Sequence, residues 1–330
     1  MQPAVTDIYL KTDPTGAGTN NLWYVDTAKQ LSKINRRLYS QTRLYGYQGL
    51  TFIWKQNAAA PTVATLEVKV ATAGNTWIVQ NAYTKGHALW NQMQDLVLED
   101  NPSIKGTWHD FKIQLSDSAS TPRSLEALAG DGGLYLDGEW NLATYVMPQH
   151  QVSDGTQIDP DTGLPIPMGE PLPAVELTAT LIGGDTASKR SLVKAYQESR
   201  ATVQPFDPAV PAAMSTSFFN LLTDSGSQEP ELADVIEGEN DEPPYDQGNY
   251  PGGEINADSA VIVGYGAISA SEVDGRIGGF VAPCGLLEIQ INGFDSAGAV
   301  IDDANMPEIE LLLHVAPGGY KGVASMPMGQ

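Results

Sequence analysis

The sequence predicts a mainly β protein that carries helical insertions, and three observations support this fold class. Hydrophobic residues make up 42% and charged residues 18% of the 330 residues, a balance that is typical of a folded chain. Short segments with alternating apolar residues, or with clustered β-branched and aromatic residues, recur along the chain. Glycine, proline, aspartate and serine separate these segments, as turns between strands require.

The first predicted element is an amphipathic helix over residues 26–39. Asp26 or Thr27 is the expected N-cap. Apolar residues follow at helical spacing, at Ala28, Leu31, Ile34 and Leu38. Because this helix precedes the first clear strand, we expect residues 1–40 to form an N-terminal extension that serves assembly and can be removed without unfolding the rest.

Strands and a second long helix are expected after residue 40. The helix covers residues 76–98 and contains Gly86, which indicates that another backbone passes close to it. The expected strands lie at residues 43–55, 65–72, 108–116, 139–148 and 174–183, and in three late segments at 259–270, 276–293 and 308–326.

A total of about eight to ten strands, joined by several very long connections, favours a two-sheet β-sandwich over a barrel of short hairpins. We expect residues 41–330 to form this domain, as a jelly roll or a Greek key. A double jelly roll is the alternative, although all six tryptophans precede residue 141, which argues against a duplication.

Charge is distributed unevenly along the chain, whose net charge is −22. The first 125 residues hold 12 bases and 9 acids, whereas residues 126–330 hold 6 bases and 31 acids. An irregular or helical acidic insertion is expected at about residues 185–258. Within it, residues 206–258 carry 12 carboxylates and no base. We expect this segment on the outer surface or at a subunit boundary, where water or a cation screens the repulsion.

Basic residues near the start of the chain form the candidate contact site. They are Lys29, Lys33, Arg36, Arg37 and Arg43. Clustered bases can bind the phosphates of a nucleic acid, or the acidic surface that residues 126–330 of a neighbouring subunit provide. Their position at the start of the chain favours the nucleic acid, and an ordinary solvated helix face is the alternative.

The sequence carries no enzyme motif, and we expect neither catalysis nor a cofactor. The four histidines lack the spacing of metal ligands, and the single cysteine, Cys284, fits a small buried apolar residue. Gly264 and Gly266 lie in a strand-like segment that leads into no helix, so they indicate sheet packing or a bulge rather than a phosphate loop. A β-sandwich glycosidase would use paired carboxylates, for which Glu139 and Glu176 are best placed.

One loop resembles a calcium site. Asp159, Asp161 and Gly163 are followed by Glu170 at the twelfth place. The glycine that such loops need at the sixth place is replaced by Leu164, so a turn is favoured over calcium binding.

The N-terminal residues show no basic region followed by an apolar run, and no segment approaches the ~20 apolar residues of a membrane span. We therefore expect synthesis in the cytosol and no membrane insertion.

Several segments taken together resemble a known family. They are NNLWYVDTAKQLSKINRRLYSQTRLYGYQGLTF, NTWIVQNAYTKGHALWNQM, PSIKGTWHDFKI, APCGLLEIQI and ELLLHVAPGGYKGVASMPMG. Their succession resembles the capsid proteins of small single-stranded DNA viruses known from aquatic sequence surveys. The resemblance implies a jelly roll, self-assembly of identical subunits into an icosahedral shell, and a place in the virion. Many such proteins carry an arginine-rich N-terminal arm for the genome, which MQPAVTDIYLK lacks, so direct contact with single-stranded DNA stays open.

A carbohydrate-binding or adhesin-like sandwich is the second hypothesis. Exposed tryptophans would then stack on sugars. The candidates are Trp23, Trp54, Trp77, Trp108 and Trp140.

Overall fold

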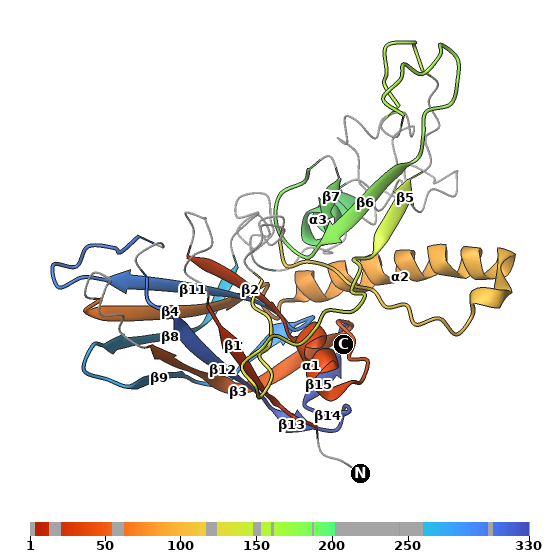
Figure 1. The fold of residues 1–330 in the computed structure, drawn as a ribbon. Helices are drawn as coiled ribbons and strands as arrows, with labels where there is room; N and C mark the ends of the chain where they lie inside the picture. Colours follow the sequence, from red (N-terminus) through yellow and green to blue (C-terminus); the bar gives the residue numbers. More distant parts are fainter. Residues whose placement is uncertain are drawn as a thin grey trace.

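Two antiparallel sheets face each other in the computed structural model and enclose the main core (Figure 1). The structure describes residues 4–12, 21–54, 63–116, 124–147, 153–159, 162–186, 188–201, 244, 260–302 and 306–329. The first sheet has the order β1 (Asp7–Lys11), β12 (Ile309–Val315), β3 (Arg43–Trp54) and β10 (Phe280–Pro283), and β3 also pairs with β9 (Asp274–Ile277) and β15 (Ser325–Pro327). The second sheet has the order β2 (Leu22–Asp26), β11 (Leu286–Phe294), β4 (Thr65–Thr72) and β8 (Val261–Ser269). The chain is therefore mainly β, as predicted.

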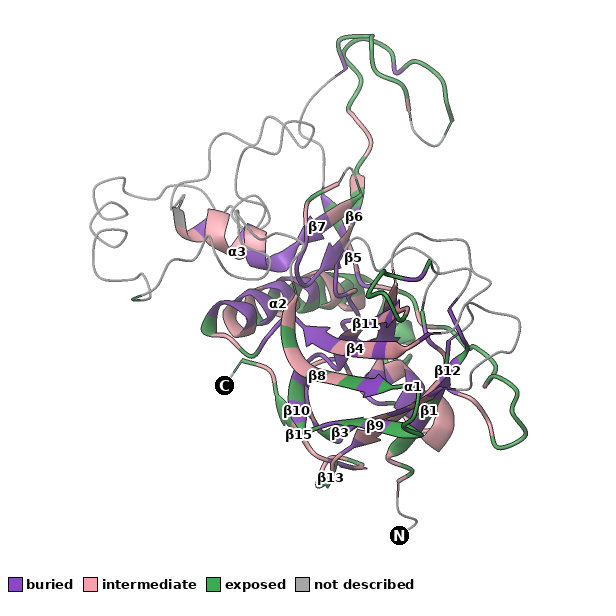
Figure 2. Cartoon of the chain, turned by 90° about the vertical axis from the view of Figure 1, so that its left-hand side faces the viewer, coloured by how far each residue is buried: buried purple, intermediate pink, exposed green. Residues whose placement is uncertain are grey.

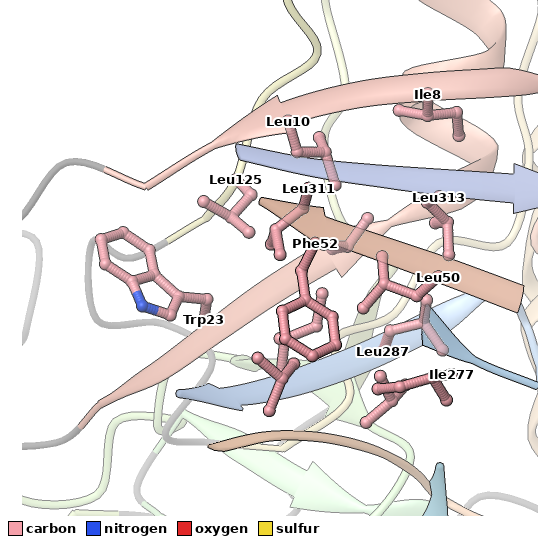
Figure 3. Close-up of a cluster of buried hydrophobic side chains, with 14 of the residues drawn as sticks. Ile8, Leu10, Trp23, Leu50, Phe52, Leu125, Ile277, Leu287, Leu311 and Leu313 are labelled. Carbon is pink, nitrogen blue, oxygen red and sulfur yellow. The ribbon is translucent and has the colours of Figure 1, made fainter. Parts of the chain in front are cut away.

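Alternation along the strands builds the core between these sheets. In β12 every second side chain is buried, from Ile309 to Val315, because successive side chains of a strand point to opposite faces. Figure 3 shows Leu311 and Leu313 of this strand beside Leu50 and Phe52 of β3.

Glycines of β8 make room for large core side chains. A Cβ atom on Gly264 would lie 2.3 Å from Ile277 Cγ2, and one on Gly266 would lie 3.0 Å from Phe52 Cε1. The prediction that these glycines serve sheet packing is confirmed.

The described residues of the N-terminal segment, 4–12 and 21–40, are part of the sandwich, and the expectation that residues 1–40 form a separate extension is wrong. Strand β1 pairs with β12 and β2 pairs with β11, so each sheet has one of its strands from this segment. The short strand β1 is hard to recognise in the sequence because both of its end residues are charged. Its residues Ile8 and Leu10 are nevertheless fully buried. Helix α1 (Thr27–Asn35) connects β2 to β3, with Asp26 as its N-cap.

A large insertion separates β4 from β8, although these two strands are neighbours in the second sheet. It contains α2 (Trp77–Asp100), the 3-10 turn η1 (Pro102–Ile104), β5 (Thr144–Met147), β6 (Val175–Thr180), β7 (Lys189–Ser191) and α3 (Leu192–Ala201). The order β5-β6-β7 forms a small sheet, which packs with α2 and α3 around a second core. Figure 2 shows buried residues both in the sandwich and where α2 meets this sheet.

The insertion begins soon after residue 72, earlier than the sequence predicts. The strand expected at residues 108–116 forms only an isolated bridge at Gln114. Apart from Pro244, the acidic segment 206–258 lies outside the described residues, so its predicted exposure stays a prediction. The remaining short strands, β13 (Pro317–Gly318) and β14 (Gly322–Val323), form a ribbon after β12.

Candidate subunit or nucleic-acid interface

The predicted basic residues fall into two groups with different surroundings. Lys29 Nζ and Lys33 Nζ each lie 2.7 Å from a carboxylate oxygen of Glu126. The same two nitrogens lie 3.2 Å and 2.9 Å from Oδ1 of Asp137. Only 9% of the Lys33 side chain is exposed. These two lysines are therefore neutralised within their own chain.

Backbone hydrogen bonds place Glu126 beside the lysines. Leu125 N donates to Tyr24 O of β2 at 2.8 Å, and Leu128 N donates to Tyr9 O of β1 at 2.8 Å. The segment between them runs along the sandwich and brings Glu126 to α1. For Lys29 and Lys33, the acidic partner is thus Glu126 of the same chain and not the acidic surface of a neighbouring subunit.

A second group of bases gathers around Tyr39 and Tyr320. The Arg43 guanidinium carbon lies 3.9 Å from the centre of the Tyr320 ring, and Lys321 Nζ lies 5.1 Å from it. Tyr39 OH donates to Lys321 O at 2.9 Å, and Arg37 Nη1 donates to the same oxygen at 3.5 Å. These three bases, together with Arg36, the C-cap of α1 that directly precedes Arg37, are called the cationic patch.

Three of the four bases in the cationic patch keep their charge available for a partner. Within the described parts of the chain, Arg36, Arg43 and Lys321 form no ion pair with a carboxylate. Arg36 and Lys321 are exposed, and both have a left-handed backbone, with φ of 51° and 49°. Such cations bind anionic groups such as phosphates and carboxylates.

Sequence reasoning missed Lys321, because it lies 283 residues beyond Leu38, which it contacts. The hydrogen bond from Lys321 Nζ to Leu38 O, at the end of the α1 region, bridges that separation. A turn-rich segment, PGGYKG, was the only local signal.

A cavity of about 190 Å³ lies beside α1, and Asp26, Trp140 and Leu286 are among its lining residues. Burial raises the pKa of Asp26 to about 6. Its carboxylate accepts hydrogen bonds from Lys29 N at 3.1 Å, from Gln41 Nε2 at 2.7 Å and from Trp140 Nε1 at 2.8 Å. These contacts use Asp26 as a helix cap and as a link between elements.

The other candidate sites are not brought together. Asp159 closes a turn, since Gly163 N donates to its carbonyl oxygen at 2.8 Å, whereas Asp161 lies outside the described residues. Across the described ranges, no group of three or more His, Cys, Asp or Glu side chains could hold a metal ion. Glu139 and Glu176 are both exposed, and neither lines the cavity.

Two of the five candidate tryptophans lie in the core, whereas Trp77 is 44% exposed. Trp23 and Trp54 are 9% and 8% exposed and belong to the main core. Trp108 is 37% exposed and lies 5.8 Å from Trp140, with Lys112 Nζ 4.0 Å from the Trp108 ring centre. The predicted series of sugar-stacking tryptophans is therefore divided between core and surface.

No family model matches the chain, and no curated protein and no solved structure is significantly similar to it. None of the helices in the described ranges combines the length and the apolar character needed to cross a membrane. The strand order and the cationic patch are the two features of the chain that bear on a function.

Proposed function

We propose that this chain is a viral major capsid protein, which self-assembles into an icosahedral shell around a single-stranded DNA genome, and that its two sheets form one jelly roll. The strand order carries this proposal. Counting β9 and β10 as one strand, because both pair with β3, the eight main strands in chain order form sheets 1-8-3-6 and 2-7-4-5. Every pairing is antiparallel.

This order is that of a long hairpin wrapped around a barrel-like core. Four hydrogen-bonded pairs define this hairpin: strands 1 and 8, 2 and 7, 3 and 6, and 4 and 5. A jelly roll with two Greek keys requires these pairs. The insertion adds only the short strands β5, β6 and β7 in the described residues. A single roll is therefore favoured over a double one.

A shell subunit also needs surfaces that contact its neighbours. The insertion and the cationic patch are two such surfaces, and both lie away from the core. Long connections at the ends of a sandwich can form contacts with neighbouring subunits without disturbing the sheets. Localisation in the virion follows from this proposal.

Negative-stain electron microscopy and analytical ultracentrifugation of the purified full chain test the proposal. We expect closed particles or regular capsomers, far larger than the 35.3 kDa chain, and nuclease-resistant DNA in closed particles. A protein that stays monomeric over a wide range of concentration and salt would contradict it, and binding to a glycan array would then favour the adhesin-like hypothesis.

A further inference from the structure

The C-terminal end of α2 projects from the molecule with an apolar stripe that no described residue covers. Leu89 and Trp90 are 7% and 6% exposed, whereas the residues two turns further along the same stripe reach solvent. Leu96 is 61% and Val97 is 45% exposed, and Ile104 just beyond the helix is 46% exposed. Figure 1 shows this end of α2 extending beyond both sheets. A helix end without tertiary contacts is marginal in water, because packing supplies most helical stability.

The same helix end carries an unfavourable set of charges. Asp95, Glu99 and Asp100 lie in its last two turns, and its last turn has no base. A helix C-terminus has a partial negative charge, so carboxylates there are destabilising. No ion pair joins these three carboxylates to any base in the described ranges, including the nearby Lys105. A cationic surface with an apolar centre would relieve both problems.

The cationic patch has that composition. Leu38, between Arg37 and the buried Tyr39, is 47% exposed, and its carbonyl oxygen accepts the hydrogen bond from Lys321. Val5 is 51% exposed and is linked to Asn35 at the end of α1 by a hydrogen bond of 2.8 Å. Exposed apolar side chains thus accompany the bases on this surface, which complements an apolar stripe that is accompanied by acids.

The two surfaces cannot meet within one molecule. Figure 1 shows the far end of α2 well separated from α1 and from β14, which flank the cationic patch. Complementary surfaces at different places on one chain produce head-to-tail contacts, which close into rings when the rotation permits.

We infer that the end of α2, residues 91–104, of one copy docks on the cationic patch of the next copy. Leu96 and Val97 contact Leu38, while Asp95, Glu99 and Asp100 pair with Arg36, Arg37 and Lys321. This inference rests on the proposed self-assembly and names the interface that produces it.

Charge reversal tests the electrostatic part. The variants D95K/E99K/D100K and R36E/R37E/K321E should each raise the protein concentration needed for assembly at least tenfold. The chain that carries all six reversals should assemble as the parent does, because attraction is restored with opposite signs. The matched control E139K/E170K/E176K changes the charge of three exposed residues elsewhere and should assemble normally. Circular dichroism verifies that each variant is folded.

Three outcomes overturn the inference. One is normal assembly of both triple variants, and another is failure of the sixfold variant while it is folded. The third is normal assembly of D95K/E99K/D100K together with an intact but DNA-free shell from R36E/R37E/K321E. That result would show that the cationic patch binds the genome and not a neighbouring subunit. A parent chain that never assembles contradicts the proposed function instead.

Cross-linking tests the contact without requiring shells. The sole native cysteine, Cys284, is buried, so the variant L38C/L96C presents two exposed thiols. Mild oxidation at high protein concentration should produce a ladder of disulfide-linked oligomers on a non-reducing gel. The control L38C/L164C, in which Leu164 is 65% exposed, should give at most a trace. Equal ladders from both variants would contradict the docking.

Discussion

At the scale of single residues, the fold decides which charges are available. Lys29 and Arg36 are alike in the sequence, yet Lys29 is paired with Glu126 and Arg36 is exposed at the end of α1. The sequence shows where bases cluster, but the partner of Lys29 lies 97 residues away. Pairing at that separation depends on the path of the chain, which local patterns do not contain.

Glu126→Gln should destabilise the protein by about 1–3 kcal/mol, since it leaves the mostly buried Lys33 with only Asp137. Burial raises the pKa of Glu126, but hydrogen bonds from Lys29, Lys33 and Gln30 outweigh burial and hold it below its ordinary value. The contribution of Glu126 is thus present above its ordinary pKa and is lost as the pH falls through the lowered one. Urea unfolding of parent and variant should differ steadily from pH 7 to 5 and converge in stronger acid. A constant difference down to pH 2 would contradict this.

Glu198→Gln should have the opposite effect. Burial, and then the charge of Asp185, raises the pKa of Glu198 to about 7. An acid whose pKa is raised by folding contributes stability that is fully present at a pH below its ordinary pKa. This contribution is lost as the pH rises from the ordinary pKa through about 7. At pH 8 the variant should be more stable than the parent by on the order of 1 kcal/mol, after discounting for solvent screening. At pH 4 the two should be equal. Thermal unfolding at both pH values measures this, and equal stability at pH 8 would contradict it.

At the scale of elements, regular long segments could be predicted and short ones could not. The helix predicted over 76–98 is α2 (Trp77–Asp100), and the strand predicted over 43–55 is β3 (Arg43–Trp54). Strand β1 was missed because its five residues include only two buried ones. The expectation of a strand over residues 108–116 is wrong, because strand-like alternation does not show how far pairing extends, and only Gln114 forms a bridge there, to Thr180 at the end of β6.

The prediction for Gly86 is right about a close contact but wrong about which atoms make it. The prediction of a close approach is right, but side chains make it: a Cβ there would lie 2.8 Å from Leu192 Cδ2 and 3.2 Å from Tyr145 Oη. Gly86→Ala should therefore destabilise the protein by about 1–2 kcal/mol, because overpacking outweighs the gain of about 1 kcal/mol in helix propensity. In a Leu192→Ala background the same change should be neutral or stabilising. A double-mutant cycle by urea unfolding measures the coupling, and independent effects would contradict the contact.

At the scale of the whole molecule, the sequence predicts two sheets but not which strands pair. The first strand pairs with the last main strand, Asp7 with His314, because antiparallel partners in such a sandwich come from opposite ends of the chain. Contacts of this separation leave no periodic signal. This is also why residues 1–40 resemble an extension in the sequence, although their described part contains two strands and a helix of the sandwich.

Deleting residues 1–40 should abolish folding. It removes β1 and β2, and with them the hydrogen-bonded partners of β12 and β11, and it exposes the core side chains that Ile8, Leu10 and Val25 cover. The shorter deletion of residues 1–5 keeps all strands and serves as the control. We expect the long deletion to be insoluble or to lack a cooperative thermal transition, and the short one to unfold within a few degrees of the parent. A soluble, cooperatively folded product of the long deletion would show that the sandwich does not need β1 and β2. If that folded product then formed no particles, residues 1–40 would act as an assembly arm.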